Sequence, residues 1–173
     1  MPGKKMLFIG ILLIALFVLL MGCVQNGNGN DTNSIAPTAI KSFSKMENAQ
    51  ICKENGKPIV RLFSTTWCPH CIWIKGAFDS TMKEYTAQGK IIAYHWELDT
   101  GDNTLTPEAE GAVPASESAI YKQFNPEGTI PTFVFGCEYY RIGNAYEAQK
   151  DLGAEIGEFK AVIEELLKGL LES

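Results

Sequence analysis

The chain has 173 residues, 46% of them hydrophobic, and a formal net charge of −5 at pH 7. This length is sufficient for one domain with a sizeable hydrophobic core. The acidic balance, without a basic stripe, argues against a nucleic-acid partner.

Residues 1–22 are predicted to be a signal or anchor segment. Lys4 and Lys5 give a positive start, and the apolar run of residues 7–21 is short for a bilayer span, which needs about 20 residues. The run ends in Leu19-Leu20-Met21-Gly22-Cys23, which resembles a lipoprotein signal apart from Met21.

Three outcomes are open for this segment: cleavage with lipid attached to Cys23, an uncleaved anchor helix, or an ordinary cleaved signal. All three place the following residues outside the cytoplasmic membrane, and the first two hold them at the extracytoplasmic face of the cell membrane. Residues 23–36 are predicted to be a flexible polar tether, because Gln25 to Ser34 includes no apolar residue. Residues 37–173 are expected to form the folded domain.

Two elements are predicted at the start of this domain. The apolar residues Ile40, Phe43, Met46 and Ile51 lie at roughly helical spacing and predict a helix over about 37–54, with Asn55-Gly56 as its end. The next run, residues 58–63, predicts a buried strand.

The stretch Trp67-Cys68-Pro69-His70-Cys71 lies between that strand and a predicted helix at about 71–88. A C-x-x-C in this position is typical of a redox site. The first cysteine is at a helix N-terminus, where unpaired N–H groups and the helix dipole favour a thiolate. The second follows on the first helical turn, so the two sulfurs can form a disulfide and release it.

The remaining pattern predicts two more helices and three more strands. Residues 100–114 are expected to be a loop, and Ser116 is expected to cap the helix after it. The expected elements are a strand at 90–99, a helix at 116–124, a strand at 129–135, a turn at Gly136-Cys137, a strand at 138–142 and a helix at about 156–170.

Residues 39–171 resemble the thioredoxin superfamily. The resemblance rests on the Trp67–Cys71 motif after a strand, on Ile130-Pro131-Thr132 before a later strand, and on the amphipathic last helix. It implies an α/β, thioredoxin-like fold with a central mixed sheet flanked by helices, and a cis Pro131 opposite the active-site sulfurs. The Cys-Pro-His-Cys motif resembles that of DsbA-type oxidants, whereas Trp67 and Ile130-Pro131 are more similar to thioredoxin itself.

The sequence departs from the family's pattern at two places. Leu62 stands where the family has a buried acid, six residues before the first cysteine. His95 falls roughly where the family has a lysine beside that acid, and it is either a substitute for the acid or a structural histidine. The second departure is the long segment 100–114, which either shapes a partner surface or is simply a loop.

The expected chemistry is dithiol–disulfide exchange with exported, cysteine-containing proteins and with a membrane or soluble redox partner. Cys68 is expected to be the exposed, reacting sulfur, stabilised as a thiolate by His70, and Cys71 the more buried, resolving one. Pro69 fits the first helical turn, and Pro131 offers a backbone edge to the client. The chemistry needs no cofactor.

Two other interpretations are open. The motif could be half of a zinc site, but zinc takes four ligands and no second C-x-x-C is present, so no metal site is predicted. The second is a thioredoxin-fold lipoprotein that holds a metal or a client protein through the same cysteines without turnover.

A structural disulfide is predicted between Cys52 and Cys137. In a thioredoxin-like topology the start of the first long strand and the end of the antiparallel strand after Pro131 lie at the same pole, far from Cys68. Cys52 precedes the former and Cys137 follows the latter. Two cysteines brought together in an oxidising compartment usually pair; separate buried thiols are the alternative.

Overall fold

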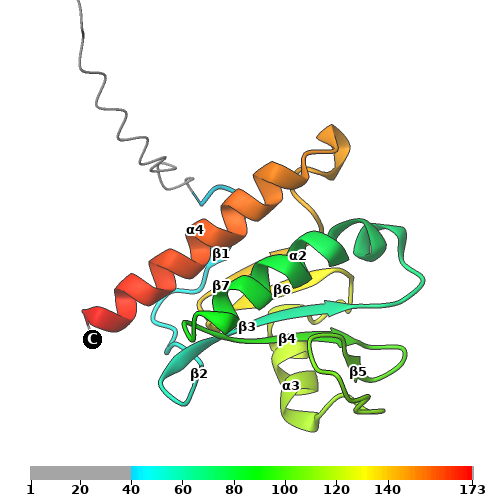
Figure 1. The fold of residues 1–173 in the computed structure, drawn as a ribbon, viewed down its shortest axis with the longest axis horizontal. Helices are drawn as coiled ribbons and strands as arrows, with labels where there is room; N and C mark the ends of the chain where they lie inside the picture. The colour runs from blue at the N-terminus through cyan, green and yellow to red at the C-terminus, as the bar shows by residue number, and fades with distance from the viewer. Residues whose placement is uncertain (1–39, 173) are drawn as a thin grey trace, which may run out of the picture. The chain divides into compact units, whose positions relative to one another are not determined.

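The computed structural model describes residues 40–172. The predicted signal or anchor segment, the tether and Cys23 lie outside these residues. Within them the fold is α/β, with a mixed sheet and α-helices on both of its faces (Figure 1). The expected central mixed sheet flanked by helices is confirmed.

The sheet formed by the described residues has seven strands, and its centre is β3. The order is β1-β7-β6-β3-β4-β5, and β2 pairs with the start of β3. Only the β3–β4 pair is parallel; each of the other pairs is antiparallel. The strands are β1 (Ser44–Lys45), β2 (Lys53–Glu54), β3 (Lys57–Ser64), β4 (Ile92–Glu97), β5 (Asp102–Asn103), β6 (Thr132–Phe135) and β7 (Tyr139–Ile142).

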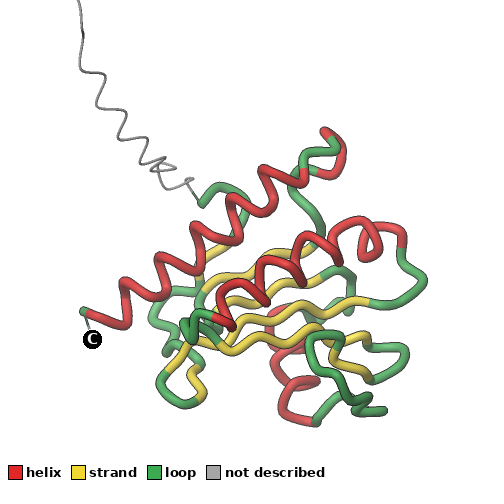
Figure 2. Tube along the Cα trace, in the orientation of Figure 1, coloured by secondary structure: helices red, strands yellow, loops and turns green. Residues whose placement is uncertain are grey.

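The helices of the described range are α2 (Pro69–Ala87), α3 (Ala115–Phe124), α4 (Leu152–Leu171) and the short 3-10 helix η1 (Glu147–Gln149). Helices α2 and α4 cover one face of the sheet, and α3 covers the other (Figure 2). Helices α2, α3 and α4 agree with the predicted helices to within a few residues, whereas η1 was not predicted. The expected cap at Ser116 is wrong, because α3 begins at Ala115 and Pro114 occupies its N-cap.

The helix predicted over residues 37–54 is also wrong. This segment instead supplies β1, which pairs with β7, and β2, which forms a hairpin with β3. Asn55 and Gly56 both have positive φ, of 50° and 76°, and connect β2 to β3. Two positive φ angles are the geometry of a type I′ hairpin turn, which Asn-Gly favours strongly. The pair thus turns a hairpin and does not end a helix.

Two hydrophobic clusters lie on opposite faces of the sheet because the side chains of each strand alternate. In β6, Phe133 and Phe135 belong to the cluster under α2 and α4, whereas Val134 belongs to the cluster under α3. The α3 side also buries an ion pair, in which Arg61 Nε donates to Glu117 Oε2 at 2.6 Å. This ion pair joins α3 to the central strand.

Cys52 and Cys137 form a disulfide, with a Cα–Cα distance of 5.3 Å. The predicted pairing is therefore confirmed, although Cys52 does not follow a helix. Backbone hydrogen bonds hold it in place: Cys52 N donates to Gly136 O at 2.8 Å, and Ile59 N donates to Cys52 O at 3.0 Å. Both sulfurs lie in the core under α3, away from the C-x-x-C motif.

Replacement of both residues in a Cys52→Ala/Cys137→Ala variant should lower the free energy of unfolding. The bridge closes a loop with a sequence separation of 85, for which the chain-entropy relation gives about 4.5 kcal/mol. Urea titration of the two proteins measures the difference. Cys68→Ala/Cys71→Ala is the matched control and should lose much less stability; an equal loss in both variants would contradict a stabilising role for the disulfide.

Candidate active site

The C-x-x-C motif forms the start of α2. Cys68 occupies the N-cap, with φ −74° and ψ 121°, and Pro69 takes the first helical position, where no hydrogen-bonding N–H is required. The first helical bond runs from Ile72 N to Cys68 O at 2.9 Å. Cys68 therefore lies where the N–H groups and dipole of the helix favour negative charge.

Cys68 and Cys71 are free thiols in this structure. Cys68 is 5% exposed and Cys71 is 2% exposed. The expectation that Cys68 is exposed is therefore wrong, since the residue is buried. Cys68 connects a buried strand end to a helix that packs on the sheet, and this position leaves its small side chain little accessible surface. The exposed groups beside the motif are instead Trp67, at 68%, and Ile72, at 59%.

The surroundings of Cys71 disfavour its thiolate. Burial, reinforced by a hydrogen bond with the Cys68 side chain, raises the pKa of the Cys71 thiol to about 12, although a backbone contact at Thr65 opposes this. Cys71 is thus the cysteine that needs help to lose its proton.

The loop before the motif is held by Asp99, which follows β4. Its carboxylate accepts hydrogen bonds from the backbone N–H of Thr66, at 3.1 and 3.2 Å, and from the Thr66 hydroxyl. The hydroxyl contact, together with the backbone bonds, lowers the pKa of Asp99 against the opposing effect of burial. These contacts fix the approach of the chain to Trp67 and Cys68.

His70 and Pro131 line the same pocket, of about 640 Å³. His70 Nδ1 lies 2.8 Å from Glu147 Oε2, and Asn144 Nδ2 donates to the His70 carbonyl and to Glu147. Although burial opposes it, these hydrogen bonds lower the pKa of Glu147. The Ile130–Pro131 peptide is cis, and the Pro131 carbonyl accepts from Gly143 N.

A buried carboxylate holds the loop that supplies Asn144 and Glu147. Glu155 accepts hydrogen bonds from Ala145 N at 2.7 Å and from Tyr146 N at 2.9 Å. Its other oxygen pairs with Arg141 Nη2 at 2.5 Å. The far wall of the His70 pocket is therefore fixed to α4 and β7.

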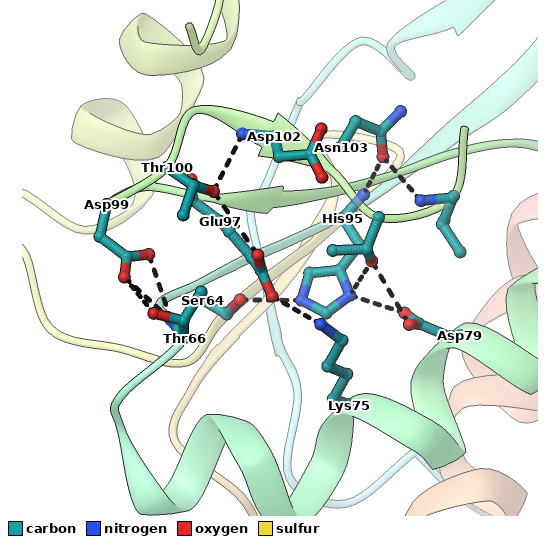
Figure 3. A network of polar contacts seen from close by, with 12 residues as sticks. Ser64, Thr66, Lys75, Asp79, His95, Glu97, Asp99, Thr100, Asp102 and Asn103 are labelled. Atoms are coloured by element: carbon teal, nitrogen blue, oxygen red, sulfur yellow. Dashed lines mark hydrogen bonds and ion pairs between the residues drawn. The ribbon is translucent and has the colours of Figure 1, made fainter. Parts of the chain in front are cut away.

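A second pocket, of about 260 Å³, lies beside Cys71. Lys75 and Glu97 line it together with Cys71, and Lys75 Nζ lies 2.6 Å from Glu97 Oε1. Ser64 also lines it, and Ser64 Oγ is 2.8 Å from His95 Nε2. Figure 3 shows how the side chains of Lys75 from α2, Ser64 from β3, and His95 and Glu97 from β4 converge.

The polar network continues from His95 into the interface between α2 and the sheet. His95 Nδ1 lies 2.6 Å from Asp79 Oδ1 (Figure 3). Thr104 Oγ1 donates to Asp79 Oδ2 at 3.3 Å. Leu62, opposite His95 in the β3–β4 register, is apolar and belongs to the core under α2.

Sequence reasoning missed Ser64, Lys75, Asp79 and Glu97. Their spacing carries a signal: residues 71, 75 and 79 recur every four positions and share a helix face, while residues 95 and 97 share a strand face. The segment 100–114, expected to be a loop, contains β5 and also contributes Asn103, whose side chain accepts from His95 N at 2.9 Å.

Two features of the described residues bear on other functions. Among residues 40–172, no group of three or more His, Cys, Asp or Glu side chains is arranged to hold a metal ion. In the same range, none of the helices combines the length and the apolar character that a membrane crossing requires. Comparisons with protein-family models and with curated proteins find no match to this chain.

The raised pKa of Cys71 predicts its reactivity. In a Cys68→Ala variant, the rate of alkylation of Cys71 by iodoacetamide should rise with hydroxide concentration without levelling off below about pH 10, because burial keeps the thiol protonated. Alkylation measured by mass spectrometry across this range tests the expectation. The same variant unfolded in urea is the control and should level off near about pH 8.5; a plateau there in the folded protein would contradict the prediction.

Proposed function

We propose that the chain is an extracytoplasmic thiol–disulfide oxidoreductase of thioredoxin-like fold that exchanges disulfides with exported proteins through Cys68 and Cys71. The observation that carries the proposal is the pair of free thiols at the N-terminus of α2, in a chain whose described part also holds a separate disulfide. One pair is thus open to redox cycling while the other cross-links the fold.

In this reaction the Cys68 thiolate attacks a client disulfide and forms a mixed disulfide, and one client sulfur leaves as a thiolate. Cys71 then attacks the Cys68 sulfur, so that the Cys68–Cys71 disulfide forms and the second client sulfur leaves. The client gains two electrons and the protein loses two. The reverse sequence oxidises a client dithiol.

The pocket between His70 and Pro131 is the proposed place for the client backbone. Because Gly143 N already occupies the Pro131 carbonyl, pairing falls to the neighbouring residue Ile130, which also lines the pocket. Trp67 and Ile72 provide exposed apolar surface beside the cysteines, which suits the side chains of an extended, unfolded segment.

The extracytoplasmic location is supported by the charged and apolar pattern of residues 1–22 and by the Cys52–Cys137 disulfide, since such bridges persist in oxidising compartments. Lipid attachment at Cys23 would hold the domain at the membrane, and the polar tether would let it reach clients and a redox partner.

Catalysis of insulin reduction by dithiothreitol tests the activity. The wild-type protein should accelerate precipitation of the insulin B chain, and Cys68→Ser should abolish the acceleration because it removes the attacking sulfur. Cys52→Ala/Cys137→Ala controls for the loss of a cysteine pair elsewhere and should remain active while folded. A wild-type rate no faster than that of dithiothreitol alone would instead favour a protein that binds clients or metal without turnover.

His70 is expected to set the redox potential of the Cys68–Cys71 pair. We expect its imidazole to stabilise the thiolate of Cys68, two residues away in the sequence, and hence the reduced form. His70→Tyr or His70→Pro should therefore make the potential more negative, by about 30 mV or more, equivalent to about 1.4 kcal/mol. Equilibration with glutathione buffers measures the potential. Lys122→Ala on α3 removes a distant positive charge and should have no effect; an unchanged potential in both His70 variants would refute this role.

A further inference from the structure

The chain of Ser64, His95 and Asp79 has the groups of a proton relay. Both ring nitrogens of His95 are engaged, one by the Ser64 hydroxyl at 2.8 Å and one by the Asp79 carboxylate at 2.6 Å. His95 is completely buried and Ser64 nearly so. With Asp79 ionised, Nδ1 carries the hydrogen and donates it to the carboxylate, which leaves Nε2 to accept a proton from Ser64.

Cys71 needs a proton acceptor. It must be a thiolate to resolve the mixed disulfide, yet the pKa of its thiol is raised to about 12 by burial. The position at which a carboxylate was expected from the resemblance holds Leu62, a fully buried aliphatic side chain. The acceptor must therefore come from another element.

The pocket beside Cys71 connects the thiol to the relay. Cys71 and Ser64 both line it, and its volume of about 260 Å³ exceeds the share of about 30 Å³ that one water molecule takes in the liquid. Thr65 Oγ1, in the same pocket, is one of the buried polar atoms within residues 40–172 that have no hydrogen-bond partner in the protein. A pocket of this size, with the polar groups of Ser64 and Thr65 on its lining, suits bridging water.

We propose that Ser64 and His95 relay the proton of Cys71 during resolution of the mixed disulfide, with Asp79 as a positioning residue. The inference rests on the proposed oxidoreductase function. The S–H bond of Cys71 breaks, and its proton passes through pocket water to Ser64 Oγ while the Ser64 proton moves to His95 Nε2. The sulfur keeps the electron pair and forms the bond to Cys68, and the client sulfur leaves as a thiolate.

Asp79 supports this transfer in two ways. Its Oδ1 accepts from Nδ1 and so selects the tautomer with a free Nε2, and its charge stabilises the imidazolium that forms. Thr104 Oγ1 holds the other carboxylate oxygen and lies 2.9 Å from Nδ1. The edge of the Phe78 ring packs against the imidazole on the α2 side, with ring centroids 5.7 Å apart.

Glu97 is the competing acceptor, since it also lines the pocket. Its two oxygens are already engaged: Oε1 lies 2.6 Å from Lys75 Nζ, and Oε2 accepts from Thr100 Oγ1 at 3.5 Å. Around His95, then, the charged groups within the described residues are Asp79 in direct contact and the Lys75–Glu97 pair at the adjoining pocket. A Glu97 variant must therefore accompany the relay variants.

Stopped-flow reaction of the fully reduced protein with dithiobis(nitrobenzoate) separates the two cysteines. The first release of coloured thiolate reports attack by Cys68, and the second reports attack by Cys71 on the mixed disulfide. Ser64→Ala should slow the second phase by about tenfold or more at neutral pH, in line with the loss of general-base assistance, and leave the first within about twofold. His95→Gln and Asp79→Asn should act on the same phase.

The pH profile separates a relay from a packing role. In the wild type the second-phase rate should level off above neutral pH, whereas in Ser64→Ala it should rise with hydroxide concentration, which then replaces the relay. Ser64→Thr keeps the hydroxyl and should retain the wild-type profile. Ser80→Ala is the matched control, because its hydroxyl donates only to the Ala77 carbonyl on α2, and both phases should be unchanged.

Two results would overturn the relay: a second phase unchanged in Ser64→Ala, or one slowed by Glu97→Gln and not by Ser64→Ala. Because Ser64→Ala removes a single oxygen atom, an unchanged first phase, which reports attack by Cys68, shows that the site is folded. Failure of the proposed function is distinguishable, since it would appear as a lack of insulin reduction by a wild-type protein that still releases two coloured thiolates.

Discussion

Cys71 is buried in the first turn of α2, and the chemistry of the site depends on this burial. The helix packs Ile74 and Phe78 into the core, and this packing takes the thiol out of water at the same time. Burial favours the protonated thiol, so the proposed reaction needs groups near Cys71 that accept its proton. The helix face that contains Cys71 also has two partly buried charged side chains, Lys75 and Asp79, at intervals of one turn.

The buried charges outside this face each connect two parts of the fold. Arg141 lies over the rings of Phe43, Phe133 and Phe159 and pairs with Glu155 and Glu158 of α4. A buried ion that lost its partner would be left uncompensated, at a cost of about 3–5 kcal/mol. Movement of the loop that faces His70 away from Glu155 therefore has a high free-energy cost, and this keeps the wall of the proposed client pocket rigid.

Local patterns were sufficient to predict strand β3, the C-x-x-C helix α2, the β6–β7 hairpin and the last helix, α4, because each is encoded within one short window. Asn55-Gly56 misled the prediction, because the same dipeptide suits a helix end and a type I′ turn, and only strand pairing distinguishes them. The Cys52–Cys137 disulfide was still predicted, since the hairpin returns Cys52 to the start of β3, the pole that a helix end would also reach. Of the relay residues, His95 was singled out in the sequence as a possible substitute for the acid. Ser64 and Asp79 were missed because a polar side chain acquires its partners from other elements, and one window does not contain them.

In the proposed reaction the two pockets have different roles, one for the client and one for the proton of Cys71. His70, Ile130 and Pro131 line one pocket, and Ser64, Lys75 and Glu97 line the other, with the start of α2 contributing to both. In the proposed reaction, a client held as a mixed disulfide on Cys68 would cover the pocket at Pro131 and exclude water from that side. The proton of Cys71 would then leave through the pocket at Ser64, where the hydroxyl, imidazole and carboxylate are already hydrogen-bonded in sequence. The proton can thus leave Cys71 while the client is still attached to Cys68, as resolution of a mixed disulfide requires.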